Sequence, residues 1–475
     1  MKILVLNCGS SSVKFQLINM TDEKAVARGL VEKIGSSDAI ITYKPVAKNK
    51  LREIQEIPHH DTALEIVLSL LLHPQHGVIK HKEEIDGIGH RVVHGGEDFS
   101  DSVLITEKVK ATIQHCIQFA PLHNPHNLSG IKACERLLPG IQQVGVFDTA
   151  FHQTIPKKAF LYGLPYSLYK KLGIRRYGFH GTSHKFVAQK AAEILKKPIE
   201  KVKLITCHLG NGASITAVDK GISVDTTMGF TPLEGLVMGT RCGDIDPALV
   251  PYIMDREGLS TKEIDNIMNK NSGMLGLTET TNDMREIEDE AFRGNEKHKM
   301  ALGVYCHRLK KYIGAYITVL GGVDAIVFTG GVGEKSFYVR EHTLTNLENL
   351  GIKIDLDLNN NNKTNIGLGK VKILIIPTNE ELAIARDTKK ILKASHKTQK
   401  IDVSTAKEPE VITDLTEEEK AQLVLLWAED PNAPFSEITR KLNKKIGKNI
   451  DEQSVKDKLK ILGLSNPSKT NKIKG

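Results

Sequence analysis

The sequence lacks long apolar runs and has few cysteines. Its longest apolar stretch, LEIVLSLLL at residues 64–72, is far too short to cross a bilayer. No signal peptide is expected, because a single lysine separates Met1 from the first predicted strand. The six cysteines show neither C-x-x-C nor zinc-finger spacing, which is typical of reduced residues in a cytosolic protein. We therefore expect a cytoplasmic protein without a membrane segment.

The chain length and the charge distribution indicate more than one domain. A chain of 475 residues is too long for one hydrophobic core, so two or three domains are expected. The net charge of +8 is uneven, because residues 436–475 carry 11 basic against 4 acidic side chains, or about +7. Residues 1–435 are therefore close to neutral, and the basic tail needs an explanation of its own.

Apolar runs typical of strands alternate with helical patterns along the first 396 residues. The predicted strands lie at residues 2–7, 14–18, 85–95, 142–151, 203–218, 325–331 and 371–377. The predicted helices lie at residues 62–72, 183–197, 299–320 and 379–395. The asparagine-rich segment 359–365 predicts a surface loop. This alternation predicts an α/β protein whose sheets are covered by helices.

Two strand-turn-strand segments are alike, at residues 6–16 (LNCGSSSVKFQ) and 209–218 (LGNGASITAV). The turn at residues 7–14 has no P-loop spacing, and its residue types also suit an ordinary polar hairpin. However, clustered backbone N–H groups, hydroxyls and a lysine are groups that bind phosphate oxygens. A duplicated hairpin of this kind predicts two related domains that hold one nucleotide between them.

Eight motifs, two of them in these hairpins, indicate a family. In chain order they are LNCGSSSVK, IGHRVVHGGEDF, PLHNPHN, FDTAFHQT, RYGFHGTSH, HLGNGAS, DTTMGFTPLEGLVMGTRCGDIDP and PTNEELAIARDT. Together they resemble the acetate kinases, of the acetate and sugar kinase/actin/heat-shock chaperone superfamily. The resemblance spans residues 1 to about 396. It implies a two-lobed α/β, ribonuclease H-like fold with a duplicated βββαβαβα core, and a homodimer. It also implies a first lobe of residues 1–148 with a returning helix at 383–396. Residues 149–382 would form a second lobe for nucleotide binding and dimer contacts.

The activity that this resemblance implies is reversible transfer of the ATP γ-phosphoryl group to acetate, directly and in line, giving acetyl phosphate and ADP. Such transfer needs positioning and charge neutralisation, and arginine is the cation that keeps its proton. By resemblance Arg91 holds the substrate carboxylate, and Arg241 with His180 stabilises the transition-state oxygens. His123 would assist at the same place. Each arginine on its own would equally suit a surface salt bridge.

Asp148 and the metal site follow from the same resemblance. Asp148 ends an apolar strand, where a buried carboxylate needs a partner or a function. The family assigns it proton transfer, but acetate is already ionised near pH 7, since its pKa is roughly 4–5. We expect Asp148 to orient the carboxylate or to hold a metal-bound water instead. Mg²⁺, with Mn²⁺ as an alternative, would be held by Asn7 and Glu380, because it prefers oxygen ligands and keeps several waters.

The resemblance also implies the residues of the nucleotide and acyl sites. The nucleotide would contact Ser10, Ser12, Lys14, His208, Leu209, Gly210, Asn211, Gly212, Asp283, Met284, Arg285, Gly331, Val332, Gly333, Glu334 and Lys335. Lys335 departs from the family, whose members often carry asparagine there. The methyl group of acetate would lie against Val93, Leu122, Phe179 and Pro232, each of which would separately be taken for a core residue.

Acetate kinases usually lack a segment like residues 400–475. Residues 397–412 predict a linker, and residues 413–475 predict a small basic module of three helices at 416–429, 434–446 and 451–464. Thr416 and Glu419 form a capping-box pattern, and Trp427 is expected to anchor the core. The lysines of the third helix give it a resemblance to Myb-like or helix-turn-helix modules. A protein-binding module, nucleic-acid binding and a poorly ordered extension all remain alternatives.

Other functions compete with the kinase interpretation. An actin-like or chaperone-like ATPase switch would share the hairpins but would not need Arg91, His123 or His180. A catalytically idle scaffold would be expected to have lost at least one of these groups, and all are present. Among enzymes, propionate or butyrate kinase is the nearest alternative, and pyrophosphate is an alternative phosphoryl donor.

Overall fold

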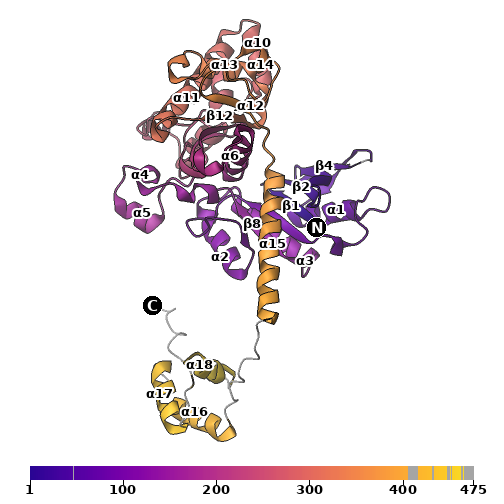
Figure 1. Cartoon of the computed structure of the whole chain (residues 1–475), viewed down its shortest axis with the longest axis vertical. Coiled ribbons are helices and arrows are strands. Elements are labelled where there is room, and N and C mark those ends of the chain that lie inside the picture. The colour runs from indigo at the N-terminus through magenta and orange to yellow at the C-terminus, as the bar shows by residue number, and fades with distance from the viewer. Residues whose placement is uncertain are drawn as a thin grey trace. The chain divides into compact units, whose positions relative to one another are not determined.

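The computed structural model describes residues 1–46, 48–404, 416–430, 433–446, 450, 452–461 and 464. The chain separates into two compact units, Met1–Ser395 and His396–Gly475 (Figure 1). Within these described residues, no helix combines the length and the apolar character needed to cross a bilayer.

The first sheet lies in the N-terminal part of the chain. Its strands are β1 (Lys2–Cys8), β2 (Ser12–Asn19), β3 (Lys24–Glu32), β4 (Ser36–Pro45), β5 (Leu51–Ile57), β6 (Gly87–Val92), β7 (Val103–Leu104) and β8 (Gln143–Phe147). They pair in the order β5-β4-β3-β2-β1-β6-β8-β7. β1 is antiparallel to β2 and parallel to β6, and β6 is parallel to β8. The predicted hairpin at residues 7–14 is the β1–β2 turn.

The second sheet repeats the central part of the first. Its strands are β9 (Lys203–Leu209), β10 (Ala213–Asp219), β11 (Ile222–Thr226), β12 (Ala325–Thr329) and β13 (Lys372–Ile375). Their order β11-β10-β9-β12-β13 matches β3-β2-β1-β6-β8 strand for strand. The directions match as well, because β9 and β10 are antiparallel whereas β9, β12 and β13 are parallel. The predicted duplication is therefore present in the topology.

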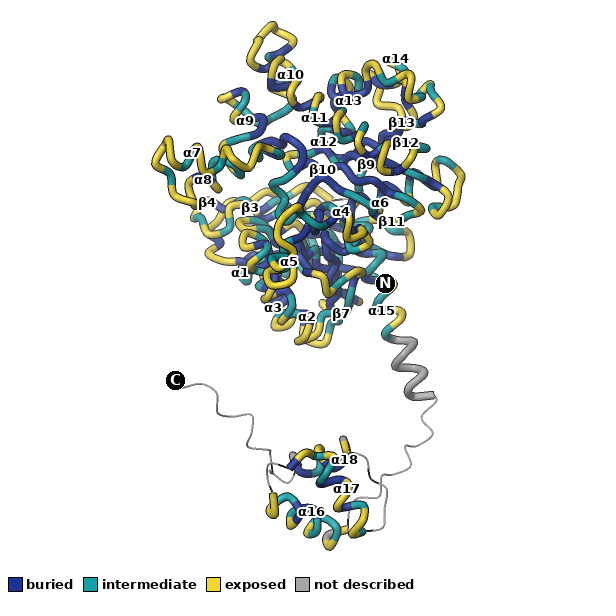
Figure 2. The backbone as a smooth tube through the Cα atoms, turned by 90° about the vertical axis from the view of Figure 1, so that its left-hand side faces the viewer, coloured by how far each residue is buried: buried dark blue, intermediate teal, exposed yellow. Residues whose placement is uncertain are grey.

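Helices cover both sheets and fill the connections. Up to the end of the second sheet they are α1 (His60–Leu72), α2 (Glu107–His115), α3 (Asn124–Leu137), α4 (Lys157–Phe160), α5 (Tyr166–Leu172), α6 (Gly181–Leu195), α7 (Leu249–Glu257), α8 (Thr261–Lys270), α9 (Gly273–Thr278), α10 (Met284–Phe292), α11 (Glu296–Leu320), α12 (Gly330–Lys335), α13 (Phe337–Leu344) and α14 (Leu356–Asn360). α15 (Glu380–Ser404) follows the second sheet. The central strands and the inner faces of these helices are buried, whereas the outer strands β3, β4 and β5 and many loops are partly exposed (Figure 2).

One helix that comes after each sheet in the chain packs on the other sheet. α6 follows β8, yet its Val187 and Ala188 lie in one cluster with Leu204 of β9 and Val327 of β12. α15 follows β13, yet its apolar side chains pack with those of β1 and β8 (Figure 1). Both helices present apolar residues at helical spacing, which is the pattern that buries one face. This exchange brings the N-termini of α6 and α15 to the gap between the sheets.

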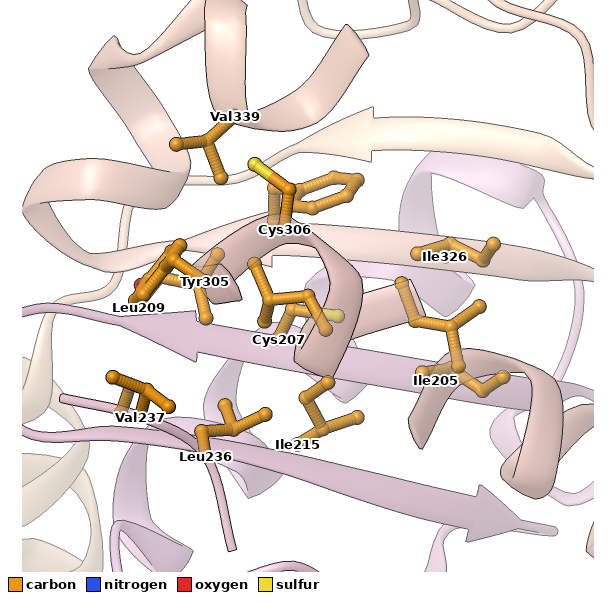
Figure 3. Packing of buried hydrophobic residues seen from close by; sticks show 14 of the residues in the cluster. Ile205, Cys207, Leu209, Ile215, Leu236, Val237, Tyr305, Cys306, Ile326 and Val339 are labelled. Carbon is orange, nitrogen blue, oxygen red and sulfur yellow. The ribbon is translucent and has the colours of Figure 1, made fainter. Parts of the chain in front are cut away.

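The largest core lies under α11. Tyr305 and Cys306 of this helix pack over Cys207 and Leu209 of β9 and Ile326 of β12 (Figure 3). The side chains are close-packed and mostly apolar, so the sheet behind the candidate site is rigidly supported.

The predicted surface loop at residues 359–365 is wrong at its first two residues, because Asn359 and Asn360 end α14. Asn359 is also fully buried, whereas residues 360–365 are exposed as predicted. The buried amide has a structural reason, because Asn359 Oδ1 accepts a hydrogen bond of 2.7 Å from Nε of the buried Arg340. A run of asparagines predicts polarity, but it does not show which member a distant cation will bind.

The C-terminal unit contains α16 (Glu417–Glu429), α17 (Phe435–Ile446) and α18 (Glu452–Ile461), in agreement with the predicted helices. The capping box of Thr416 and Glu419 is confirmed. The core consists of Leu423, Leu426, Ala433, Ile438, Leu442, Val455 and Leu459. Trp427 is only partly buried against this cluster, so aliphatic residues form its centre rather than the predicted tryptophan. Of the predicted linker, residues 397–404 continue α15, and residues 405–412 lie outside the described residues.

Candidate active site

A cavity of about 340 Å³ lies between the two sheets. It collects residues from the β1–β2 hairpin, from β6, from the β9–β10 hairpin and from the N-termini of α6 and α15. The lining residues are Val5, Asn7, Lys14, Arg91, His180, His208, Gly210, Asn211, Gly212, Thr378, Glu380, Glu381 and Ile384. We call this cavity the central cleft. It contains both predicted hairpins and both predicted metal residues.

Arg91 and Asp148 form a buried ion pair beside the cleft. Arg91 Nε and Nη2 donate to Asp148 Oδ2 at 3.0 and 2.6 Å, and Glu380 Oε2 lies 3.8 Å from Arg91 Nε. Burial raises the pKa of Asp148, and the Arg91 guanidinium opposes that shift. Burial also opposes the charge of Arg91, but the carboxylates of Asp148 and Glu380 outweigh it and raise its pKa. Two charge-assisted hydrogen bonds of this length hold the guanidinium at a fixed angle.

His180 occupies a strained position at the start of α6. It is the N-cap residue and has a left-handed backbone with φ of 56°. Gly181 permits this turn, because a Cβ there would lie 2.3 Å from the carbonyl oxygen of Asp148. The Gly181 N–H donates to that same oxygen at 2.9 Å. The strained loop is therefore tied to Asp148 through the residue that follows His180, and strain of this kind is typical of functional sites.

The His180 ring stacks on the His208 ring with 4.3 Å between centroids. Burial, together with the neighbouring histidines and arginines, lowers the pKa of His180 well below its usual value. Burial likewise lowers the pKa of His208 to about 4. Both rings are therefore neutral at physiological pH.

Arg241 meets His180 over Gly212. A Cβ on Gly212 would lie 3.3 Å from Arg241 Nη1 and 3.6 Å from His180 Nε2, so both groups approach the same point. Arg241 Nη1 donates to the carbonyl of Pro232 at 3.3 Å, and within the described part of the chain Arg241 makes no ion pair. Burial lowers the pKa of Arg241 but leaves it charged. A half-buried cation without a carboxylate partner suits an anionic ligand.

A second cavity, of about 710 Å³, adjoins Arg241. His123, Leu122 and Pro232 line it together with Arg241. Burial, followed by the charges of Arg91 and Arg241, lowers the pKa of His123 to about 4. Of the four predicted acyl residues, Leu122 and Pro232 therefore face this cavity. Val93 and Phe179 lie in the buried core instead.

A third cavity, of about 480 Å³, shares Gly210 and Asn211 with the central cleft. The predicted residues that line it are Gly210, Asn211, Asp283, Met284, Arg285, Gly331, Val332 and Lys335. Asn282, Glu288, Tyr305 and Ser336 also line it and carried no signal in the sequence. The two cavities therefore adjoin at Gly210 and Asn211.

The remaining predicted nucleotide residues do not line these cavities. Leu209 and Gly333 are buried behind the β9–β10 hairpin and the α12 turn. Glu334 Oε1 accepts from the Gly330 N–H at 2.9 Å and so braces the turn. Ser10 and Ser12 do not line the cleft, whereas Val5, Asn7 and Lys14 of the same hairpin do.

The cleft suits an ion of the Mg²⁺ type. Asn7 and Glu380 both offer oxygen atoms to it. The described residues contain no group of three or more His, Cys, Asp or Glu that would form an all-protein metal cage. Mg²⁺ binds through one or two protein oxygens and retains waters, so this sparse donor set fits it.

A protein-family model for the acetokinase family matches residues 2–386. The chain belongs to the acetokinase family. The acetate kinase of Methanosarcina mazei is 55% identical over 401 residues, which cover 84% of this chain and 98% of that protein. The resemblance drawn from the motifs is thereby confirmed.

Solved structures of the family have the same fold. An acetate kinase from Porphyromonas gingivalis is 48% identical, with a TM-score of 0.80 over 82% of this chain and 99% of that one. A propionate kinase from Francisella tularensis is 46% identical, with a TM-score of 0.78 over the same shares. This likeness confirms the predicted two-lobed fold. The family model ends at residue 386, so the C-terminal unit is an addition to it.

Proposed function

We propose that this chain transfers the γ-phosphoryl group of ATP to acetate, reversibly, giving acetyl phosphate and ADP. The observation that carries the proposal is the convergence of Arg241 and His180 over Gly212, between the nucleotide-sized cavity and the cavity lined by Leu122 and Pro232. An anionic group held at that point would lie between a nucleotide and a small apolar-walled substrate. The relatives' names support acetate as the acceptor.

The chain's own residues divide the work of positioning and charge neutralisation. Arg91, fixed by Asp148, would bind the acetate carboxylate. Arg241 and the neutral His180 would donate hydrogen bonds to the oxygens of the transferring phosphoryl group. Such preorganised donors stabilise charge where it develops in the transition state. Asp148 keeps Arg91 in place, so no proton transfer by Asp148 is required. Asn7 and Glu380 would hold Mg²⁺, which supplies further neutralisation of phosphate charge.

A hydroxamate assay tests the reaction. The purified chain should form acetyl phosphate from acetate and Mg-ATP, with propionate slower and butyrate slower still. The same assay with pyrophosphate in place of ATP decides the donor. Preferential use of propionate or butyrate would show that the chain is a propionate or butyrate kinase. Hydrolysis of ATP without formation of an acyl phosphate would overturn the proposal.

Val93→Ala is expected to raise the ratio of kcat/KM for propionate over acetate. Val93 packs in one core cluster with Phe179 and Ala120, so its truncation opens space behind the proposed acyl site. The change should not exceed about 10–200-fold, which is the value of roughly one methylene. Val92→Ala is the matched control, because Val92 is buried in a different cluster. Equal ratios in the two variants would show that Val93 does not limit the acyl site.

A chain that ends after Ser395 is expected to fold and to keep kcat within a few-fold of the full chain. The boundary between the two compact units lies at this residue, and the last apolar residue of α15 in the kinase core is Leu392. The measurement is the hydroxamate assay on both chains with circular dichroism as a folding control. Loss of activity in a folded truncated chain would show that the C-terminal unit serves the reaction.

We further propose a homodimer in the cytoplasm, with the C-terminal unit as an attached binding module. The free cysteines among the described residues support a reducing compartment. The separate core of the unit and the exposed cations of α17 and α18 support a role in recruitment, for which a protein partner is the first choice. Light scattering tests the dimer. Retardation of DNA or RNA by the full chain at low salt, lost at higher salt, would favour nucleic acid instead.

A further inference from the structure

A row of fully buried polar side chains leads from the second sheet to His180. Thr206 lies on β9, Ser214 on β10 and His184 on α6, and each has no exposed surface. His184 stands four residues after the N-cap His180, and the centroids of the two rings are 6.5 Å apart. Three adjacent buried polar groups would be costly without mutual hydrogen bonds.

Hydrogen-bond contacts join these side chains to His180 in one continuous row. Thr206 Oγ1 lies 2.7 Å from His184 Nδ1, and His184 Nε2 lies 2.7 Å from Ser214 Oγ. Ser214 Oγ then lies 2.9 Å from His180 Nδ1. The remaining nitrogen, His180 Nε2, faces the point above Gly212 that Arg241 also approaches.

The number of available protons decides which atom donates in each hydrogen bond of this row. The other partner of Thr206 Oγ1 among the described residues is the Thr216 carbonyl, at 3.5 Å, which is the limit of a hydrogen bond. The Thr206 hydroxyl therefore donates its proton to His184 Nδ1. His184 then carries its own proton on Nε2 and donates it to Ser214 Oγ. The Ser214 proton in turn goes to His180 Nδ1, so the proton of a neutral His180 must be on Nε2.

The opposite directions fit less well. If His180 Nδ1 donated to Ser214, the Thr206 proton would have only the long contact to Thr216. If both histidines donated to Ser214, its own proton would have no acceptor within the described residues. Donation from Thr206 to His184, from His184 to Ser214 and from Ser214 to His180 is the one arrangement in which all three protons lie in contacts of 2.9 Å or less.

We propose that Thr206, His184 and Ser214 are positioning residues that hold His180 in its Nε2–H form, so that a neutral imidazole presents a hydrogen-bond donor to the transferring phosphoryl group. This inference rests on the proposed function for its catalytic consequence, but the tautomer itself does not. An imidazolium is then unnecessary, which agrees with the strongly lowered pKa of His180. Donation survives at high pH, where an imidazolium would have lost its proton.

The first test is spectroscopic and needs no substrate. Long-range ¹H–¹⁵N correlation spectra of the full chain, labelled with ¹⁵N-histidine, distinguish the two neutral tautomers from the imidazolium. His180→Gln identifies the His180 signals by their loss. The expected result at neutral pH is the Nε2–H tautomer in the wild type and a shift toward a mixture in Thr206→Val. An Nδ1–H tautomer or an imidazolium in the wild type would overturn the proposal, whatever the enzyme's substrate.

The second test is kinetic. Thr206→Val removes the first donor without touching the cleft, and kcat should fall about 3- to 10-fold while KM for acetate and ATP changes less than about twofold. Thr206→Ser, which restores the hydroxyl, should recover most of the loss. Thr216→Val is the matched control, since Thr216 is a buried threonine paired with Thr206 across the strands whose hydroxyl bonds Thr226 instead. Equal kcat losses in Thr206→Val and Thr216→Val would show that Thr206 contributes only to packing, and would overturn the proposal that the row positions His180.

Discussion

Arg241→Ala is expected to lower kcat/KM for acetate by at least about 100-fold, as is usual when a donor to transition-state charge is removed. Arg241 is half-buried, makes no ion pair among the described residues, and approaches the point above Gly212 together with His180. Its removal therefore leaves no buried carboxylate unpaired, and the loss should appear mainly in kcat with the fold intact. Arg241→Lys keeps the charge but not the planar fork, so an intermediate activity is expected.

Arg91→Ala should lower kcat/KM by a similar factor, but for two reasons. It removes the proposed carboxylate ligand and also leaves Asp148 buried without its bidentate partner. Its folding must therefore be checked separately, by circular dichroism and thermal unfolding. Arg28→Ala, at an exposed position on β3, is the control for both variants. Near-normal activity in Arg241→Ala and Arg91→Ala would refute the assignment of the site.

Arg340→Met is expected to lower the free energy of unfolding by about 2–5 kcal/mol, which is the range for leaving several buried acceptors of a charged donor without partners. The Arg340 guanidinium donates to Asn359 Oδ1 at 2.7 Å, to the Gly333 carbonyl at 2.9 Å and to Asn362 Oδ1 at 2.6 Å. Burial lowers its pKa to about 10, so it stays charged at neutral pH. This one side chain joins α14 to the α12 turn beside the nucleotide cavity, and KM for ATP should rise as well.

The stability measurement is urea unfolding followed by far-UV circular dichroism. Tryptophan fluorescence would not serve, because Trp427 is the only tryptophan and lies in the other compact unit. Arg293→Met is the control, since the Arg293 side chain is 72% exposed and its ion pair with Glu290 should be worth well under 1 kcal/mol. If Arg340→Met unfolds at the same urea concentration as the wild type, the buried guanidinium does not hold α14.

The sequence by itself determined the local elements and the family. Short apolar runs marked β1, β2, β6, β8, β9, β10, β12 and β13 but missed β3, β4, β5, β7 and β11. Helical spacing marked α1, α6, α11 and α15, and Thr416 with Glu419 marked the start of α16. These features depend on neighbours within a few residues, so they can be read without the fold. The motifs around Arg91, His180 and Arg241 identified candidate site residues for the same reason, because each motif is a short continuous segment.

Only the tertiary structure decided which polar groups meet. The exchange of α6 and α15 between the sheets sets the N-cap His180 beside Asp148, and the pairing of β9 with β10 sets Ser214 and Thr206 beside His184. The same applies to the burial of Asn359 by Arg340, and to the placement of Leu122 and Pro232, but not Val93, on the large cavity. Apolar periodicity specifies which face of an element is buried. The partner of a buried donor is set by strand order and register, which join residues far apart in the chain.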